Sequence, residues 1–203
     1  MRRKVFDMLV STGGAVVVVL LLVAGSLAMW GYTFAKSNVH DQLAQQQITF
    51  PAKGSQELAS PLIGPYLNKY AGQQLLTGDQ AKAYADHFIA VHLSQMPYGG
   101  VYSKVSAASR ANPSDTKLAA EVQTAFQGTT LRGLLLEAYA FSTFGQIALW
   151  SAIAAFSLAG VMAILVAFGF WHAMRTPEDV EVLGRHRART PTPITPQAGA
   201  TSA

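Results

Sequence analysis

The sequence predicts a mainly α-helical membrane protein, with two transmembrane helices and a small extracytoplasmic helical region between them. Composition and charge pattern lead to this fold class. Hydrophobic residues make up 50% of the 203 residues and charged residues only 13%, roughly half the charged fraction of an average soluble domain. The chain also contains two long stretches without formal charge, and basic residues gather near the two chain ends.

The uncharged stretches are long enough to cross a bilayer. The first has 28 residues between Asp7 and Lys36, and the second has 37 residues between Glu137 and Arg175. A helix needs about 20 apolar residues to cross the hydrocarbon core. Each stretch therefore contains one candidate transmembrane helix.

Aromatic residues indicate where the two spans end. Tryptophan and tyrosine concentrate at membrane interfaces, which favours a first span over residues 9–31 and a second over residues 150–172. The aromatic residues at these ends are Trp30, Tyr32, Trp150 and Trp171.

The basic residues predict the orientation. Lysine and arginine beside transmembrane helices are enriched on the cytoplasmic side. Residues 1–8 and the tail over 173–203 are basic next to the spans, so we expect both termini in the cytoplasm and residues 32–137 outside the plasma membrane. The basic residues concerned are Arg2, Arg3, Lys4, Arg175, Arg185, Arg187 and Arg189.

A cleaved signal peptide is the alternative interpretation of the first span. The opening "MRRK", the apolar run and the "SLA" at residues 26–28 resemble such a peptide. Against this, the run is longer than the 7 to 15 residues of a usual signal core, and Trp30 with Tyr32 is typical of an interface anchor.

The outer region is expected to consist of helices packed on an extension of the second span. Residues 138–149 form a stem in this interpretation, and one rod from Thr129 to His172 would measure about 66 Å. The stem and its start offer Leu134, Leu135, Ala138 and Phe141 to the other outer helices.

Two further helices are predicted in this region, joined by a hinge-like connection over residues 98–115. The first begins at an N-cap, Thr77 or Asp79, and stops at Pro97. The second is capped by Ser114 or Asp115. Residues 36–76 are expected to be ordered loop with short helical turns.

Histidines are the only candidate metal ligands with suggestive spacing. On an α-helix His87 and His92 lie about 140° apart around the axis, whereas ligand pairs on helices use three- or four-residue spacing. We therefore predict no metal site; the weak candidates are His87 and His92, with His40 or Asp41 as further ligands.

Small residues repeat every four positions in the second span and predict close helix packing in lipid. The first span offers Ala24, Gly25 and Ala28 in return. The packing partner is the first span, a second copy of the chain or another membrane protein. The repeating residues are Ser151, Ala155, Ala159, Ala163 and Ala167.

The sequence contains no motif for disulfides, catalysis or cofactor binding. No cysteine is present, which excludes disulfides and thiolate sites, and no phosphate loop, nucleophile elbow or zinc-protease motif occurs. We predict no catalytic residue and no cofactor. The basic excess lies at the chain ends instead of on one face, so nucleic acid is not an expected partner. The tail over 173–203 is expected to be disordered, and phosphorylation of Thr190, Thr192 and Thr195 would offset its basic charge.

Three segments resemble a family of two-span membrane proteins from actinobacteria. They are "NVHDQLAQQQITFPAKGS", "IGPYLNKYAGQQLLTGDQAKAYADHFIAVHL", and "TLRGLLLEAYAF" through "GQIALW". The resemblance covers roughly residues 1–172 and implies no assigned activity. Members sometimes carry the label aromatic ring-opening dioxygenase, which implies an iron site and a soluble catalytic domain.

Two function hypotheses follow. The preferred one is a non-catalytic cell-envelope accessory or scaffold protein that docks a partner, either another membrane protein or a second copy of the chain, with the lipid bilayer around its spans. The alternative is an iron-dependent, dioxygenase-like enzyme that uses the extracytoplasmic histidines.

Overall fold

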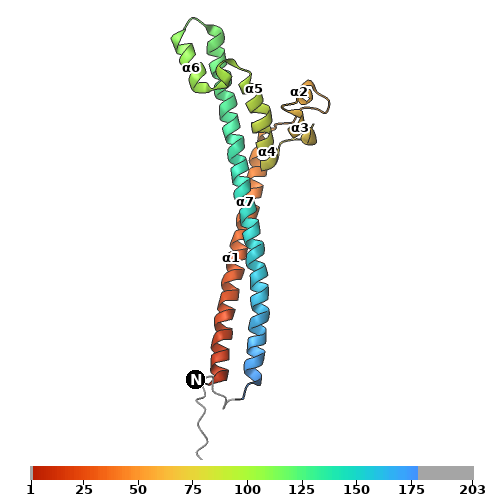
Figure 1. Ribbon diagram of the computed structural model, residues 1–203, viewed down its shortest axis with the longest axis vertical. Coiled ribbons are helices and arrows are strands. Elements are labelled where there is room, and N and C mark those ends of the chain that lie inside the picture. The colour runs from red at the N-terminus through yellow and green to blue at the C-terminus, as the bar shows by residue number, and fades with distance from the viewer. Residues whose placement is uncertain (1, 178–203) are drawn as a thin grey trace, which may run out of the picture. The chain divides into compact units, whose positions relative to one another are not determined.

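The computed structural model describes residues 2–177 and shows a helical protein (Figure 1). The mainly α class is therefore confirmed for this part of the chain, while the predictions for residues 178–203 lie outside the described residues. The elements are α1 (Arg3–Gln46), α2 (Gln56–Ala59), α3 (Gly64–Leu67), η1 (Asn68–Tyr70), α4 (Gly78–Tyr84), η2 (Ala85–Ile89), α5 (Ala90–Ser94), η3 (Pro97–Gly100), α6 (Tyr102–Ala111) and α7 (Thr116–Arg175).

Helices α1 and α7 are long and apolar enough to cross a membrane. They have 44 and 60 residues, or about 66 and 90 Å at the usual rise. Their most apolar windows are only 11% and 6% buried, whereas the core helix of a soluble protein hides most of its surface. Such apolar surface on both helices is what contact with lipid requires.

The chain divides into two compact units, residues 21–157 and residues 1–20 with 158–203. In the larger unit α1 and α7 pack antiparallel at small residues. A Cβ atom at Gly25 would lie 2.9 Å from the Phe156 ring, and one at Gly145 would lie 3.0 Å from the Ala35 Cβ. Glycine at these points lets the backbones approach closely.

In an antiparallel pair, a residue further along α1 lies opposite a residue earlier in α7. The contacts of Gly25 with Phe156 and of Ala35 with Gly145 therefore place Trp30 of α1 level with Trp150 of α7. Along α7, Trp171 follows Trp150 by about 32 Å at 1.5 Å per residue. A hydrocarbon core is about 30 Å thick. The distance between the two tryptophans along α7 is therefore close to that thickness.

Helix α7 begins earlier than the sequence indicates. We expected a separate helix capped near residue 115 and a rod from Thr129, but the two form one helix that starts at Thr116. The Asp115 carboxylate caps it by accepting a hydrogen bond from the Leu118 amide at 2.9 Å. Gly128 does not interrupt the helix; a Cβ there would lie 2.8 Å from Leu93 Cδ2, so the glycine admits α5 close to α7.

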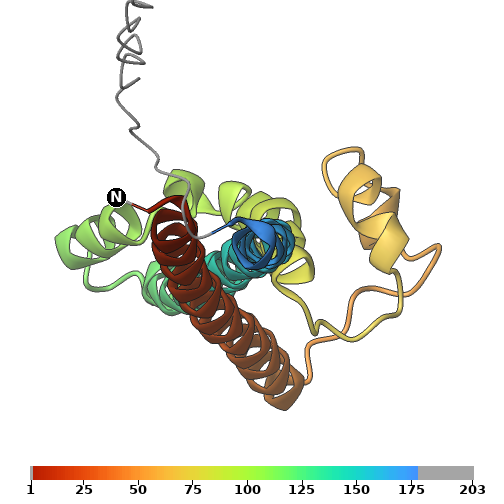
Figure 2. The same cartoon turned by 90° about the horizontal axis from the view of Figure 1, so that it is seen from below.

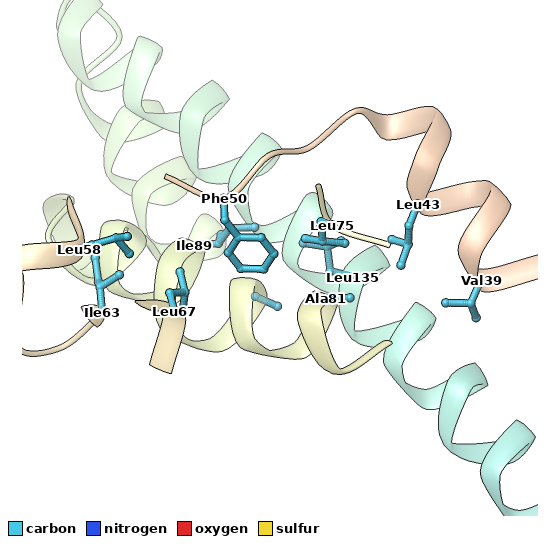
Figure 3. Packing of buried hydrophobic residues seen from close by; sticks show 11 residues of the cluster. Val39, Leu43, Phe50, Leu58, Ile63, Leu67, Leu75, Ala81, Ile89 and Leu135 are labelled. Atoms are coloured by element: carbon cyan, nitrogen blue, oxygen red, sulfur yellow. The ribbon is translucent and has the colours of Figure 1, made fainter. Parts of the chain in front are cut away.

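The larger unit has three layers, which the buried side chains connect. Figure 3 shows the core running from α2 and α3 through α4 and η2 to α7 and α1. Helices α2 and α3 form the outermost layer, as Figures 1 and 2 both show. The buried residues of this core are Val39, Leu43, Phe50, Leu58, Ile63, Leu67, Leu75, Ala81, Ala85, Ile89 and Leu135.

The start of α4 follows from its sequence. Thr77, one of the two predicted caps, accepts a hydrogen bond from the Gln80 amide at 3.3 Å, and Gln80 Oε1 accepts one from the Thr77 amide at 3.0 Å. This reciprocal pair is a capping box. Gly78 allows the helix start to contact α7, because a Cβ there would lie 2.7 Å from Ser142 Oγ.

Two loop predictions differ from the structure. Residues 98–115 are not simply a hinge, since they contain α6, whose Val105 is fully buried. Helix α1 continues to Gln46 and so takes up the first eleven residues of the segment expected to be loop and turns. The rest of that segment does contain the expected short turns, α2, α3 and η1.

Candidate functional site

The histidine-bearing segment is one helical rod with a wider turn in its middle. Residues Ala85–Ile89 form the π-helical turn η2, in which the Ala90 amide donates to the Ala85 carbonyl. This turn lies between α4 and α5 and changes the angle between His87 and His92 from the value for a regular α-helix. The angle of about 140° that a regular α-helix would give these two histidines therefore does not apply here. The role of each histidine follows from its side-chain contacts.

Each histidine has a different environment. The His87 ring stacks on Tyr66 of α3, with centroids 3.5 Å apart and planes 3° apart. His92 Nδ1 lies 2.7 Å from the Phe88 carbonyl oxygen, and its ring lies 4.4 Å from the Phe88 ring. His40, on α1, lies 3.2 Å from Asp41.

These contacts do not assemble a ligand set. Within residues 2–177 no group of three histidine, aspartate or glutamate side chains is placed to hold a metal ion. The candidates His40, His87 and His92 lie on α1, η2 and α5. The iron-enzyme hypothesis therefore gains no support from the described part of the chain.

The π-turn instead carries an ion cluster that joins it to α7. Asp86 Oδ1 accepts a hydrogen bond from Arg132 Nη2 at 2.9 Å, and Oδ2 accepts one from Lys82 Nζ at 2.7 Å. Arg132 Nε also donates to the Ala85 carbonyl at 3.3 Å. No local pattern in the sequence predicts this cluster, because Asp86 and Arg132 are far apart in the chain.

The cluster affects the titration of its members. The hydrogen bond from Lys82 is the largest cause that lowers the pKa of Asp86; Arg132 acts in the same direction, while partial burial opposes both. The hydrogen bond to Asp86 in turn raises the pKa of Lys82. The Asp86 side chain is 23% exposed, so water screens these interactions in part. Their arrangement holds two helices together and leaves no free acid or base.

The predicted small-residue ridge of the second span divides between two faces of α7. Ala155 and Ala159 are among the less exposed residues, whereas Ser151, Ala163 and Ala167 are exposed. The covered face follows seven-residue spacing, as in a coiled coil. Its members on α7 are Gly145, Ala148, Ala152, Ala155, Ala159, Met162, Val166, Gly169 and Ala173.

In the smaller unit, α1 and α7 again meet at a glycine. A Cβ at Gly169 would collide with Ser11 Oγ, and one at Gly14 would lie 2.7 Å from Val166 Cγ2. Ser11 is 5% exposed. Asp7 Oδ2 lies 3.8 Å from His172 Nε2 at the same end of the helix pair.

An apolar groove lies between α1 and α7. On α1 it begins at Asn38, eight residues after Trp30. It has a volume of about 340 Å³. Leu134 and Phe141 line it and are 58% and 37% exposed. Amide and carboxylate side chains also line it. The lining residues are Asn38, Val39, Gln42, Leu43, Gln46, Leu131, Leu134, Leu135, Glu137, Ala138 and Phe141.

Aromatic rings connect this groove to the level of the tryptophans. Trp30 stacks on Phe34 with centroids 5.7 Å apart, and Phe34 meets Phe141 edge-on at 6.3 Å. Trp30 and Phe34 are 66% and 50% exposed. Of the four stem residues expected to contact the outer helices, Leu135 is buried in the core, while Leu134 and Phe141 line the groove. Ala138 lines it as well.

Comparison with protein-family models, curated proteins and solved structures finds no match to this chain. The functional argument therefore depends on the chemistry and exposure of the residues described above.

Proposed function

We propose that the protein is a non-catalytic scaffold of the cell envelope, anchored by α1 and α7, whose groove between these helices docks a membrane-anchored helix. Both termini lie in the cytoplasm in this proposal, and residues 32–137 lie outside. The partner is another membrane protein or a second copy of the chain.

The observation that carries the proposal is the exposed apolar groove with its aromatic connection to Trp30. Exposed apolar surface of this kind is uncommon on a water-facing domain and marks interaction sites. Leu134 and Phe141 stand seven residues apart, two turns along one face of α7, which suits the apolar stripe of a docked helix. A helix that leaves the bilayer next to Trp30 would enter the groove without a bend.

Photo-cross-linking in native membranes tests the docking. A photo-reactive amino acid at Gln42, which lines the groove, is expected to give a discrete product, and the same group at exposed Lys104 of α6 serves as the control. Leu134→Arg places a charge in the groove and should abolish the Gln42 product. Mass identifies the partner as a second copy or another protein. The same product from both positions, or no product at Gln42, refutes the docking.

Cysteine labelling tests the orientation separately. The chain has no cysteine, so single-cysteine variants need no background substitution. A membrane-impermeant maleimide should label Ser114→Cys in intact cells and Thr176→Cys only after lysis. The opposite pattern would place the helical region in the cytoplasm.

A further inference from the structure

A second pocket lies between α1, α7 and the start of α4, and side chains of both charge signs line it. Its volume is about 290 Å³. Seven of its eleven lining residues are polar or ionic. The residues are Tyr32, Lys36, Val39, His40, Leu76, Thr77, Gly78, Asp79, Ser142, Gly145 and Gln146.

The pocket lies at the depth of lipid headgroups if the tryptophans mark the interface. Lys36 is six residues beyond Trp30 on α1, about 9 Å along the helix axis. The headgroup layer occupies several ångströms on each side of the hydrocarbon core. The long Lys36 side chain therefore reaches back to the phosphate groups of the bilayer, whereas His40, ten residues and about 15 Å beyond Trp30, lies outside that layer.

Lys36 is available to bind an anion. Its Nζ lies 5.8 Å from the centroid of the Tyr32 ring, and no carboxylate within residues 2–177 pairs with it. On His40, the nitrogen that faces Asp41 is Nδ1, which leaves Nε2 for a ligand. Two cationic or donor groups one helical turn apart on α1 thus face one pocket.

The opposite wall carries a negative charge. Asp79 stands in the first turn of α4 and is exposed to the pocket. The close contact of Gly78 with Ser142 holds this turn against α7. A purely anionic ligand would meet Asp79 unfavourably, whereas a ligand with both a phosphate and an ammonium group matches the two walls.

The lower side of the pocket leads to lipid-facing surface. Ile153 lies two turns beyond Gln146 on the same face of α7 and is 42% exposed. An acyl chain attached to a headgroup in the pocket would lie along this face. The surroundings thus suit a whole lipid molecule better than a soluble phosphate compound.

We propose that this pocket binds a phospholipid headgroup that carries an amine, with the phosphate at Lys36 and the ammonium at Asp79. The proposal rests on the two spans crossing the bilayer, but not on docking in the groove.

Native mass spectrometry of the full chain tests it. Protein is reconstituted with equal amounts of phosphatidylethanolamine and phosphatidylglycerol, and bound lipid is measured after release. We expect one phosphatidylethanolamine retained in preference to phosphatidylglycerol. Lys36→Ala should reduce the retained lipid by about tenfold, the effect of losing about 1.4 kcal/mol of binding free energy, and Asp79→Asn should shift the preference to phosphatidylglycerol. Lys104→Ala is the control, because Lys104 is an exposed lysine on α6 that lines neither this pocket nor the groove.

Several outcomes overturn the proposal. These are equal retention of both lipids by the unaltered protein, no loss in Lys36→Ala, or the same loss in Lys104→Ala. Displacement of the lipid by inorganic phosphate would show a soluble-anion site instead. Carbonate extraction of membranes separates this from failure of the proposed function: a protein that resists extraction but retains no lipid disproves only the pocket.

Discussion

Replacing Leu135 by alanine should strongly destabilise the helical region outside the spans. Leu135 is 2% exposed and lies in the core beside Leu75, where α7 meets the segment that carries α4 and α5 (Figure 3). The substitution removes three carbon atoms, about 2.4 kcal/mol of transfer free energy. The remaining cavity adds to this, for a total of about 3 kcal/mol or more.

The neighbouring residue provides the control. Leu134 is 58% exposed, so Leu134→Ala makes the same chemical change on the same helix turn and should cost less than about 1 kcal/mol. Pulse proteolysis of detergent-purified full-length protein measures the difference, because about 2 kcal/mol between the two variants should raise the open population about thirtyfold more in Leu135→Ala. Equal effects of the two substitutions would refute packing of the outer layers on α7.

Three further predictions follow from single contacts. Asp86→Asn removes the carboxylate whose pKa its lysine and arginine partners lower; above about pH 5 the variant should be less stable by roughly 1 kcal/mol. A lowered pKa contributes stability that is lost only as the pH falls through it, so the difference should begin to shrink near pH 4 and disappear at lower pH; urea titrations that show a constant difference contradict this. Gly78→Ala should lower the urea midpoint because its Cβ would collide with α7, whereas Gly133→Ala, with no atom near its Cβ, should raise the midpoint, with a gain of up to about 1 kcal/mol in the free energy of unfolding. Gly169→Leu should lower the thermal midpoint of the detergent-solubilised chain while Gly160→Leu should not, since only the first points at α1; equal midpoints would argue against close pairing there.

The spans and helix caps were predictable because they depend on local chemistry. The uncharged stretches after Asp7 and after Glu137 lie within α1 and α7, since a run of apolar residues of that length favours one helix. Thr77 begins α4 because a threonine followed three residues later by glutamine completes a capping box.

Tertiary contacts decided the rest. The segment around α6 contains glycines and Pro113, which indicate a loop, yet burial of Val105 stabilises a helix between them. No residue type in the sequence predicts the π-turn over Ala85–Ile89. Its Ala85 carbonyl also accepts a hydrogen bond from Arg132. The covered residues of α7 repeat every seven positions because α7 is paired with α1. The sequence alone does not show which helix is the partner. The two pockets could not be predicted from the sequence, because each is lined by residues from distant segments.

The order in which the core residues are synthesised has a consequence for biogenesis. Val39 and Leu43 leave the ribosome early, but Leu135, against which the middle layer packs, follows about 90 residues later. At 5 to 20 residues per second, this is a delay of roughly 5 to 20 s. During that interval Val39 and Leu43, and later the side chains of the middle layer as they are made, have no partner on α7, so their apolar surface stays exposed until the final helix is synthesised.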